Sequence, residues 1–268
     1  MRNKAISNEV LKKLFLSNNP FPHVVIDDFL EKDVFDNLLK EFNEFYNSNK
    51  NEGRNYQTEV EKNKWSSQGL SLSPFLKNIG EYLASEENRK WLTEITGFKN
   101  ISAVKNFNSK EIGFFSMMKK GSYLGPHIDH MFDMTGDQGY HVLNIILYVS
   151  EKWDPNWGGN TFLRNRKSKS YASVEFKPNR ALVFMHSPLS EHGTSLVSEF
   201  SEADRMTIYF DYYCSDKNPY RHTEYNFKLV KSPHMFFLPN FLDYLKPKNF
   251  KYLKFMLSHF KLKLKSYL

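Results

Sequence analysis

Apolar positions in the first hundred residues recur at intervals of three and four. One such run covers residues 34–45, and a second covers residues 75–97 and closes on Gly97. This spacing puts the apolar side chains on one face of an α-helix. Residues 20–30, ahead of the first run, indicate a short strand. We therefore expect N-terminal helices that pack on a separate core.

Residues 47–73 are polar and show no periodicity. Such a stretch predicts a long loop, and long loops are commonly functional lids or mobile insertions. From about residue 100 to residue 214 the pattern changes to short apolar or alternating runs separated by Gly, Pro and Asn. These runs are typical of an all-β sandwich or barrel. The chain is therefore predicted to be mainly β with flanking helices.

The C-terminal end carries the excess positive charge. Residues 246–268 hold seven lysines and no acidic residue, so the net charge of +7 leaves the rest of the chain neutral. This does not support a nucleic-acid partner, which needs positive charge on the binding face itself. The segment's apolar positions keep helical spacing between lysines: Phe250, Leu253, Leu257, Phe260, Leu264 and Tyr267. We expect an amphipathic helix that packs on its own domain, with packing in a dimer or attachment to an anionic membrane surface as alternatives.

Composition limits the fold and its surroundings. The chain has 268 residues, 40% of them hydrophobic, which is enough for a sizeable core. A single cysteine, Cys214, excludes an intrachain disulfide and suits a reducing compartment. No secretory h-region and no membrane-spanning stretch is present in the sequence. We expect a cytoplasmic single domain with a helical N-terminal part (1–99), a β core (100–215) and a C-terminal extension (216–268).

The common nucleotide-binding and hydrolase motifs are absent from the sequence, which leaves its histidines as the main candidates for chemistry. His127 and Asp129 are two positions apart at the end of an alternating run. On a strand, residues i and i+2 point to the same face, so both side chains would point into a barrel while Ile128 points away. This spacing predicts two ligands of a metal site.

A third ligand must come from elsewhere in the chain. His192 follows a separate apolar run, residues 181–185, and can lie at the end of a distant strand opposite the first pair. His186 is an alternative to His192, and His130 and His141 are alternatives for the first pair. Two histidines and one carboxylate leave open positions on a metal, as in the facial triad of non-haem Fe(II) oxygenases.

Arg205 begins a strand-like run in which Arg205, Thr207 and Tyr209 share one face. An arginine that points into a barrel needs a counter-charge, and its planar guanidinium suits a carboxylate. A small dicarboxylate bound beside the metal would supply that charge, with the Thr207 hydroxyl adding a hydrogen bond. The alternative is an internal salt bridge with an acidic residue of the chain.

These motifs follow one another in a specific order. Residues 123–129 contain Tyr-x-Gly-Pro-His-x-Asp, a Gly-Gly-Asn-Thr run begins at Gly158, and the strand before His192 is followed by Arg205-x-Thr207. The order resembles the iron- and 2-oxoglutarate-dependent dioxygenases of the prolyl 4-hydroxylase-like group. Residues 21–30 also resemble the opening of bacterial and yeast members. The resemblance covers about residues 20–214 and implies a double-stranded β-helix core of the jelly-roll or cupin-like kind.

The resemblance implies three ligands for Fe(II): His127, Asp129 and His192. O2 would take a further position on the iron. The cosubstrate 2-oxoglutarate would chelate the iron with its 2-oxo acid end and pair with Arg205 through its far carboxylate, beside Thr207. Tyr123 and Asn144 would line the cosubstrate pocket. The distance from His192 to Arg205, 13 positions, is a little longer than usual in the group. Prolyl hydroxylases acting on collagen-like chains commonly have lysine at this place, so the arginine argues for a more distant subgroup.

The implied reaction is hydroxylation of an unactivated C–H bond, coupled to conversion of 2-oxoglutarate to succinate and supported by ascorbate. The substrate would be prolyl, peptidyl or a small molecule, chosen by residues 47–73, 131–140 and those after Cys214. Two alternatives stay open. One is a cupin-like sugar-binding or epimerising protein without redox chemistry, and the other is an interaction protein on an inactivated oxygenase scaffold.

Overall fold

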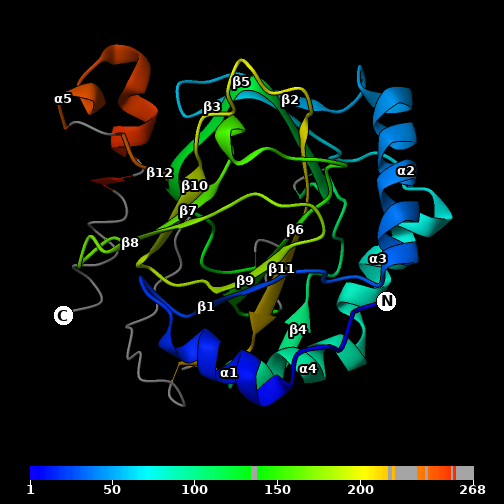
Figure 1. Ribbon diagram of the computed structural model, residues 1–268. Helices are drawn as coiled ribbons and strands as arrows, with labels where there is room; N and C mark the ends of the chain where they lie inside the picture. Colours follow the sequence, from blue (N-terminus) through cyan, green and yellow to red (C-terminus); the bar gives the residue numbers. More distant parts are fainter. Residues whose placement is uncertain are drawn as a thin grey trace.

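The computed structural model describes residues 1–110, 112–133, 138–216, 219–220, 234–238, 241–254 and 256–257. Its centre is an antiparallel sheet that nearly closes into a barrel (Figure 1). The main path of this sheet runs in the order β1, β9, β6, β11, β5, β10, β7, β8. The expected mainly β fold with a jelly-roll core is therefore confirmed.

The strands of the main path have these bounds: β1 His23–Ile26, β5 Phe115–Ile128, β6 Tyr140–Tyr148, β7 Thr161–Asn165, β8 Tyr171–Val174, β9 Ala181–Met185, β10 Ser190–Thr194 and β11 Arg205–Cys214. Four further strands pair at its sides: β2 Arg54–Tyr56, β3 Glu61–Ser66, β4 Ile101–Ala103 and β12 Met235–Phe236. Strands β5, β10 and β11 supply most of the chemistry described below.

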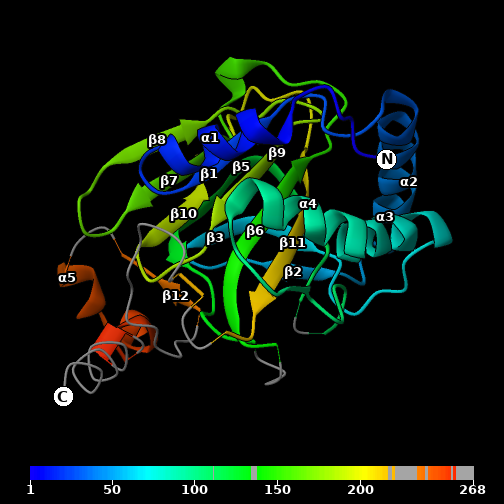
Figure 2. The ribbon, with the colours of Figure 1, turned by 90° about the horizontal axis from the view of Figure 1, so that it is seen from below.

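Four helices cover one side of the barrel, and α5 (Phe241–Tyr244) lies beside β12 on the other (Figures 1 and 2). They are α1 Asn8–Ser17, α2 Lys32–Asn49, α3 Pro74–Ala84 and α4 Glu86–Thr96. The helix expected from residues 34–45 is α2, and its buried Phe42 packs 4.6 Å from the ring of Phe115 on β5. Burying one such side chain contributes about 1.5–3 kcal/mol. The sequence interpretation did not identify α1.

The second helical run, residues 75–97, is divided into two helices at Ser85. This residue ends α3, and its hydroxyl then accepts a hydrogen bond from the backbone N–H of Asn88 in the first turn of α4. Its extended backbone forces the chain to turn between the helices. Gly97 ends α4 in the left-handed conformation, as a helix C-terminus favours.

The prediction of a long loop over residues 47–73 is wrong, because β2 and β3 form a hairpin inside it and β3 pairs with β5. The hairpin looks polar because one face borders an open cavity. Lys64 and Glu61 of β3 form an ion pair of 3.0 Å there, while Trp65 on the other face packs 6.2 Å from Phe45 of α2. Short strands of this kind lack the apolar alternation that identifies a core strand.

The expected C-terminal helix lies partly outside the described residues, and its positions Phe260, Leu264 and Tyr267 cannot be compared with the structure. Residues 250–254 are helical, and Leu253 packs with Tyr252 against Val60 of the hairpin connection. Phe250 is 54% exposed, so it does not belong to this contact. Within the described part of the chain, no helix has the length and apolarity needed to span a bilayer.

Candidate active site

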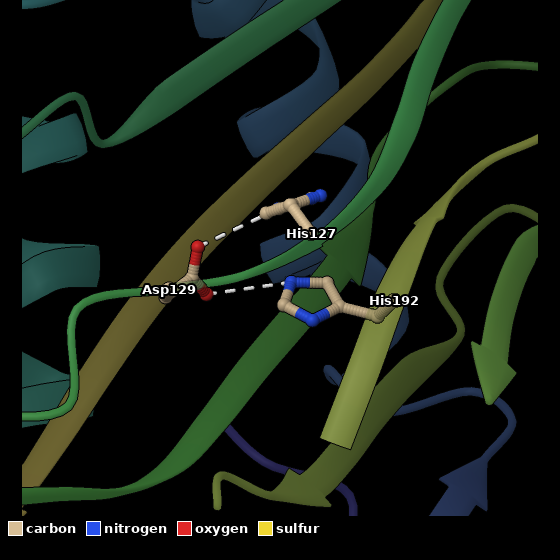
Figure 3. Close-up of side chains that lie close together, drawn as sticks. All are labelled: His127, Asp129 and His192. Atoms are coloured by element: carbon tan, nitrogen blue, oxygen red, sulfur yellow. Dashed lines mark ion pairs between the residues drawn. The ribbon is translucent and has the colours of Figure 1, made fainter. Parts of the chain in front are cut away.

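His127 on β5 and His192 on β10 face each other across neighbouring antiparallel strands. They are register partners, and their ring centroids are 4.2 Å apart. Gly193 makes this close approach possible, because a Cβ there would lie 2.3 Å from the ring of Phe162 and 2.5 Å from the carbonyl oxygen of Leu124. Asp129 follows directly after β5 and turns its carboxylate toward both rings (Figure 3).

The three side chains form a buried group of possible metal donors. Nε2 of His127 is 3.5 Å from Oδ1 of Asp129, and Nε2 of His192 is 3.3 Å from Oδ2 (Figure 3). Nδ1 of His127 lies 2.9 Å from the carbonyl oxygen of Gly125, and Nδ1 of His192 lies 3.4 Å from that of Ser190. These carbonyls favour protonation at Nδ1, which leaves the Nε2 lone pairs free to bind a metal.

The electrostatics of the group suit a divalent cation. Burial alone would raise the pKa of Asp129, but His192 and His127 hold it well below its usual range. Burial, and then the neighbouring His127, lower the pKa of His192, which favours the neutral ligand form. Neutral Nε2 lone pairs directed at a carboxylate repel it unless a cation lies between them. Two donors about 2.1 Å from one ion are separated by about 3.0–3.5 Å at ordinary coordination angles, which matches the distances here.

The cavity beside these donors measures about 420 Å³, and Arg205, Thr207 and Tyr209 of β11 line one wall. The Tyr209 hydroxyl donates a hydrogen bond of 2.7 Å to Oδ2 of Asp129. Burial raises the pKa of Tyr209 far above its usual value, so this hydroxyl keeps its proton. Asp129 is therefore held in place by a neutral donor.

Arg205 is 3% exposed and pairs with no carboxylate in the part of the chain that the structure describes. Its Nε donates to the carbonyl oxygen of Gly159 at 2.6 Å and its Nη2 to the Thr161 hydroxyl at 3.0 Å. Burial lowers the pKa of Arg205 to about 10, which still leaves it charged at neutral pH. A buried cation without a counter-ion is costly, so this wall of the cavity is suited to an anion. The internal salt bridge considered from the sequence is not formed among the described residues.

Two residues expected to line the cosubstrate pocket do not reach it. Tyr123 donates its hydroxyl to the backbone carbonyl oxygen of Glu59. An extra residue in β5 between Leu124 and His127 shifts the register against β10, so that Leu124 rather than Tyr123 lines the cavity. Asn144 lies behind the cavity wall, where its Nδ2 donates to the Tyr209 hydroxyl at 2.6 Å.

Two of the alternative histidines, His130 and His141, form a second group of possible metal donors with Asp211. Nδ1 of His141 faces the carbonyl oxygen of His130 at 3.0 Å, and Nε2 of His130 lies 2.9 Å from the Tyr213 hydroxyl. Although burial opposes charge on His141, Asp211 at 3.4 Å raises its pKa. We interpret this pair as a charged brace between β6 and β11. His186 stacks on His141 at 4.0 Å and lies outside the group of three donors.

The sequence interpretation assigned substrate choice to residues 47–73 and to those after Cys214, which supply the outer wall of the cavity, but it named none of the lining residues. Arg54 and Tyr56 of β2, with Lys64 of β3, line it from the hairpin, and His234 lines it from the C-terminal extension. The sequence signal that could have identified this wall is the two-residue spacing of Arg54 and Tyr56, which Lys64 and Ser66 repeat. It is the alternation of a strand whose one face meets a polar cavity.

Residues 113–213 match the family model described as the 2OG-Fe(II) oxygenase superfamily. The matched stretch contains His127, Asp129, His192 and Arg205, and over it the chain is similar to this superfamily. The predicted resemblance and the prediction that the chain is an enzyme are thereby confirmed. No curated protein sequence matches the chain.

Solved structures share the fold at low sequence identity. A Pseudomonas putida prolyl-4-hydroxylase is 13% identical with a TM-score of 0.55, and the match covers 78% of this chain and 100% of that chain. A Trichoplax adhaerens prolyl hydroxylase, in complex with a hypoxia inducible factor peptide fragment, is 15% identical with a TM-score of 0.55, over 77% of this chain and 90% of that one. HygX from Streptomyces hygroscopicus, with nickel, 2-oxoglutarate and hygromycin B bound, is 13% identical with a TM-score of 0.51. The match covers 81% of this chain and 90% of that one.

Proposed function

We propose that this protein is an Fe(II)- and 2-oxoglutarate-dependent dioxygenase that hydroxylates an unactivated C–H bond and converts 2-oxoglutarate to succinate. His127, Asp129 and His192 would hold the metal, because their free donor atoms face one another in a buried site. Bound Fe(II), together with 2-oxoglutarate and O2, supplies the oxidising chemistry of this reaction class. The protein itself binds the cosubstrate and the substrate, orients them at the metal and excludes water from the site.

The observation that carries the proposal is the buried, unpaired Arg205 on the same cavity as the three donors. A lone metal site would not require a buried cation beside it. A dicarboxylate satisfies both the metal site and the buried arginine. One of its ends can bind the metal while the far carboxylate pairs with the guanidinium. Thr207 lines the cavity next to Arg205 and is placed to add a hydroxyl contact.

Tyr209 would act as a positioning residue for the metal ligands. Its hydroxyl donates to Asp129, and Nδ2 of Asn144 donates both to that hydroxyl and to Oδ1 of Asp211 at 2.8 Å. This chain of hydrogen bonds fixes the carboxylate from behind, as outer contacts do in metal sites. Asn144 therefore takes a supporting role in the proposal, in place of the cosubstrate contact expected from the sequence.

The substrate would enter past the hairpin and meet a polar wall. The guanidinium of Arg54 lies 4.8 Å above the ring of Tyr56 and pairs with no described carboxylate, whereas the charge of Lys64 is balanced by Glu61. One unbalanced positive charge on this wall favours a substrate that carries an anionic or strongly polar group. The neighbours bind a peptide fragment in one case and hygromycin B in another, so both peptidyl and small-molecule substrates stay within the proposal.

Succinate formation tests the proposal without knowledge of the substrate. The purified protein is incubated with Fe(II), ascorbate and 2-oxoglutarate, and succinate is measured against a metal-free control. We expect slow uncoupled turnover in the unaltered protein and none in an Asp129→Ala variant, since a facial site with two ligands does not retain the metal. If the unaltered protein forms no succinate above the metal-free control, the proposal is wrong, and a non-redox jelly-roll protein becomes the better hypothesis.

A further inference from the structure

The C-terminal extension places one more histidine at the metal site. His234 directly precedes β12, whose residues Met235 and Phe236 pair with Ile128 and His127 of β5. The pairing continues into the backbone N–H of Phe237, which donates to the carbonyl oxygen of Pro126 at 2.8 Å. An added strand next to His127 thus fixes the backbone beside His234. This segment lies outside the stretch that matches the family model.

Side-chain packing on both faces of β12 holds it in place. Met235 and Phe237 join Ile128 and Met131 in a small apolar cluster, and the guanidinium of Arg166 lies 3.8 Å above the ring of Phe237. Phe236, on the other face, packs in the cluster that contains Val60, Tyr244 and Tyr252. The position of His234 is therefore built into the fold and is not that of a free chain end.

The imidazole of His234 approaches the carboxylate of Asp129 at the spacing of the other two histidines, and it stands just outside the group of three mutually close donors. Its Nδ1 is 3.4 Å from Oδ1 of Asp129, close to the 3.5 Å and 3.3 Å that separate Asp129 from His127 and His192. Its ring lies 5.0 Å from that of His127, with an angle of 10° between the ring planes. Its side chain is 42% exposed, whereas those of the other three residues are at most 7% exposed. His234 therefore lies on the solvent side of the site.

We propose that His234 is a displaceable fourth protein ligand of the metal, supplied by the C-terminal extension. The inference rests on the proposed function, because it assumes the metal site of His127, Asp129 and His192. Three protein ligands leave three of six positions open, and 2-oxoglutarate and O2 together need all three. A fourth protein ligand would fill one of them in the resting protein. His234 would then have to leave before O2 could bind, so this side chain would limit the access of oxygen to the metal.

Binding of Co²⁺ alone tests the inference, since its visible spectrum reports the number and type of ligands. The full-length protein, His234→Phe and His234→Ala are titrated with Co²⁺ under anaerobic conditions without 2-oxoglutarate. His234→Phe keeps a ring of similar size but has no donor nitrogen, so it preserves the packing around β12. His23→Phe is the matched control, because it removes a buried histidine of β1 that does not line the cavity.

We expect both His234 variants to change the Co²⁺ spectrum and to weaken binding about tenfold, and His23→Phe to leave both unchanged. If the unaltered protein binds Co²⁺ and the His234 variants match it in spectrum and affinity, His234 is not a ligand and the three-residue metal site stands. If the unaltered protein binds no Co²⁺, the proposed metal site itself fails. The two failures are therefore distinguishable in one titration.

Discussion

At the scale of single residues, the site depends on where each imidazole places its proton. His127 and His192 both direct Nδ1 to a backbone carbonyl of their own strand, two residues earlier. The strand geometry that brings the rings together thus also selects the tautomer that can bind a metal. Asp129 supplies the negative charge, and Tyr209 fixes one of its oxygens. The sequence pattern predicted the three residues, but it contained no information on their tautomers.

Removing any one of the three donors should abolish metal binding. We expect His127→Ala, Asp129→Ala and His192→Ala each to lose stoichiometric Fe(II) and turnover, because two protein donors are too few to retain the ion. Equilibrium dialysis with Fe(II) under anaerobic conditions measures this directly. The matched control is His186→Ala, which removes a buried histidine behind the site. If His192→Ala retains iron while His186→Ala loses it, the assignment of the distal ligand is wrong.

Arg205 should control the affinity for 2-oxoglutarate and leave the metal unaffected. A charge-assisted bidentate pair is worth about 1.5–3 kcal/mol, so Arg205→Ala should raise the half-saturating concentration of 2-oxoglutarate at least tenfold. Arg205→Lys keeps the charge and should recover part of this loss. Succinate formation at a series of 2-oxoglutarate concentrations measures the effect, and dialysis checks the iron. An unchanged half-saturation would mean that Arg205 has a structural role only.

At the scale of elements, the apolar stripes identified α2 and the helical run that the structure divides into α3 and α4, because the burial of a helix face dictates its sequence period. Tyr123 shows where such reasoning stops. Strict alternation counted back from His127 places Tyr123 on the cavity face. The extra residue between Leu124 and His127 reverses this alternation, so that Leu124 faces the cavity instead. The hairpin β2–β3 was missed for a related reason, since its polarity comes from a cavity formed by distant strands. Neither a bulge nor a distant partner is visible in a local pattern.

Asp27 and Arg180 clamp β1 to the edge of the sheet, and their ion pair should make stability depend on pH. Nε of Arg180 donates to Oδ1 of Asp27 at 2.6 Å, next to the paired strands β1 and β9. The hydrogen bond from Arg180 lowers the pKa of Asp27 more than partial burial raises it, and Lys177 adds to the lowering. A carboxylate with a depressed folded-state pKa stabilises the fold above its unfolded pKa of 3.8. That contribution is lost as the pH falls through the folded-state value.

We expect Asp27→Asn to lower the free energy of unfolding at neutral pH by about 0.2–1 kcal/mol, because the pair is partly exposed and screened by solvent. The difference between variant and unaltered protein should shrink as the pH falls from neutral through the lowered folded-state pKa of Asp27. Urea unfolding at neutral pH and at a series of acidic pH values measures it. A difference that persists unchanged in acid would show that Asp27 acts by packing and not by its charge.

At the scale of the whole molecule, the cavity is walled by all three parts of the chain. The barrel contributes the metal donors and Arg205, the N-terminal part contributes the hairpin, and the extension contributes His234 and Phe236. The extension also contacts the hairpin connection directly, through Tyr252 on Val60 and an ion pair between Lys248 and Glu59. The division at residues 99 and 215 and the location in the cytoplasm stay predictions. The contacts of the extension could not be predicted from the sequence, because its partners are the hairpin and the edge of β5.

Deletion of residues 246–268 separates the interpretations of the lysine-rich end. It removes Tyr252 and Lys248, which pack on and pair with the hairpin connection, but leaves β12 and His234 in place. We expect a lower melting temperature and lower solubility, because the deletion uncovers Val60 and Tyr244. Val60 lies in the connection to β3, so the hairpin wall of the cavity should loosen as well.

Thermal unfolding, size-exclusion chromatography and binding to vesicles containing an anionic lipid are measured on both proteins. An unchanged melting temperature with loss of salt-sensitive vesicle binding would instead show a membrane anchor, and an unchanged melting temperature with loss of a dimer would show an interface between copies. If none of these properties changes, the segment neither packs on the domain, nor dimerises, nor attaches to membranes.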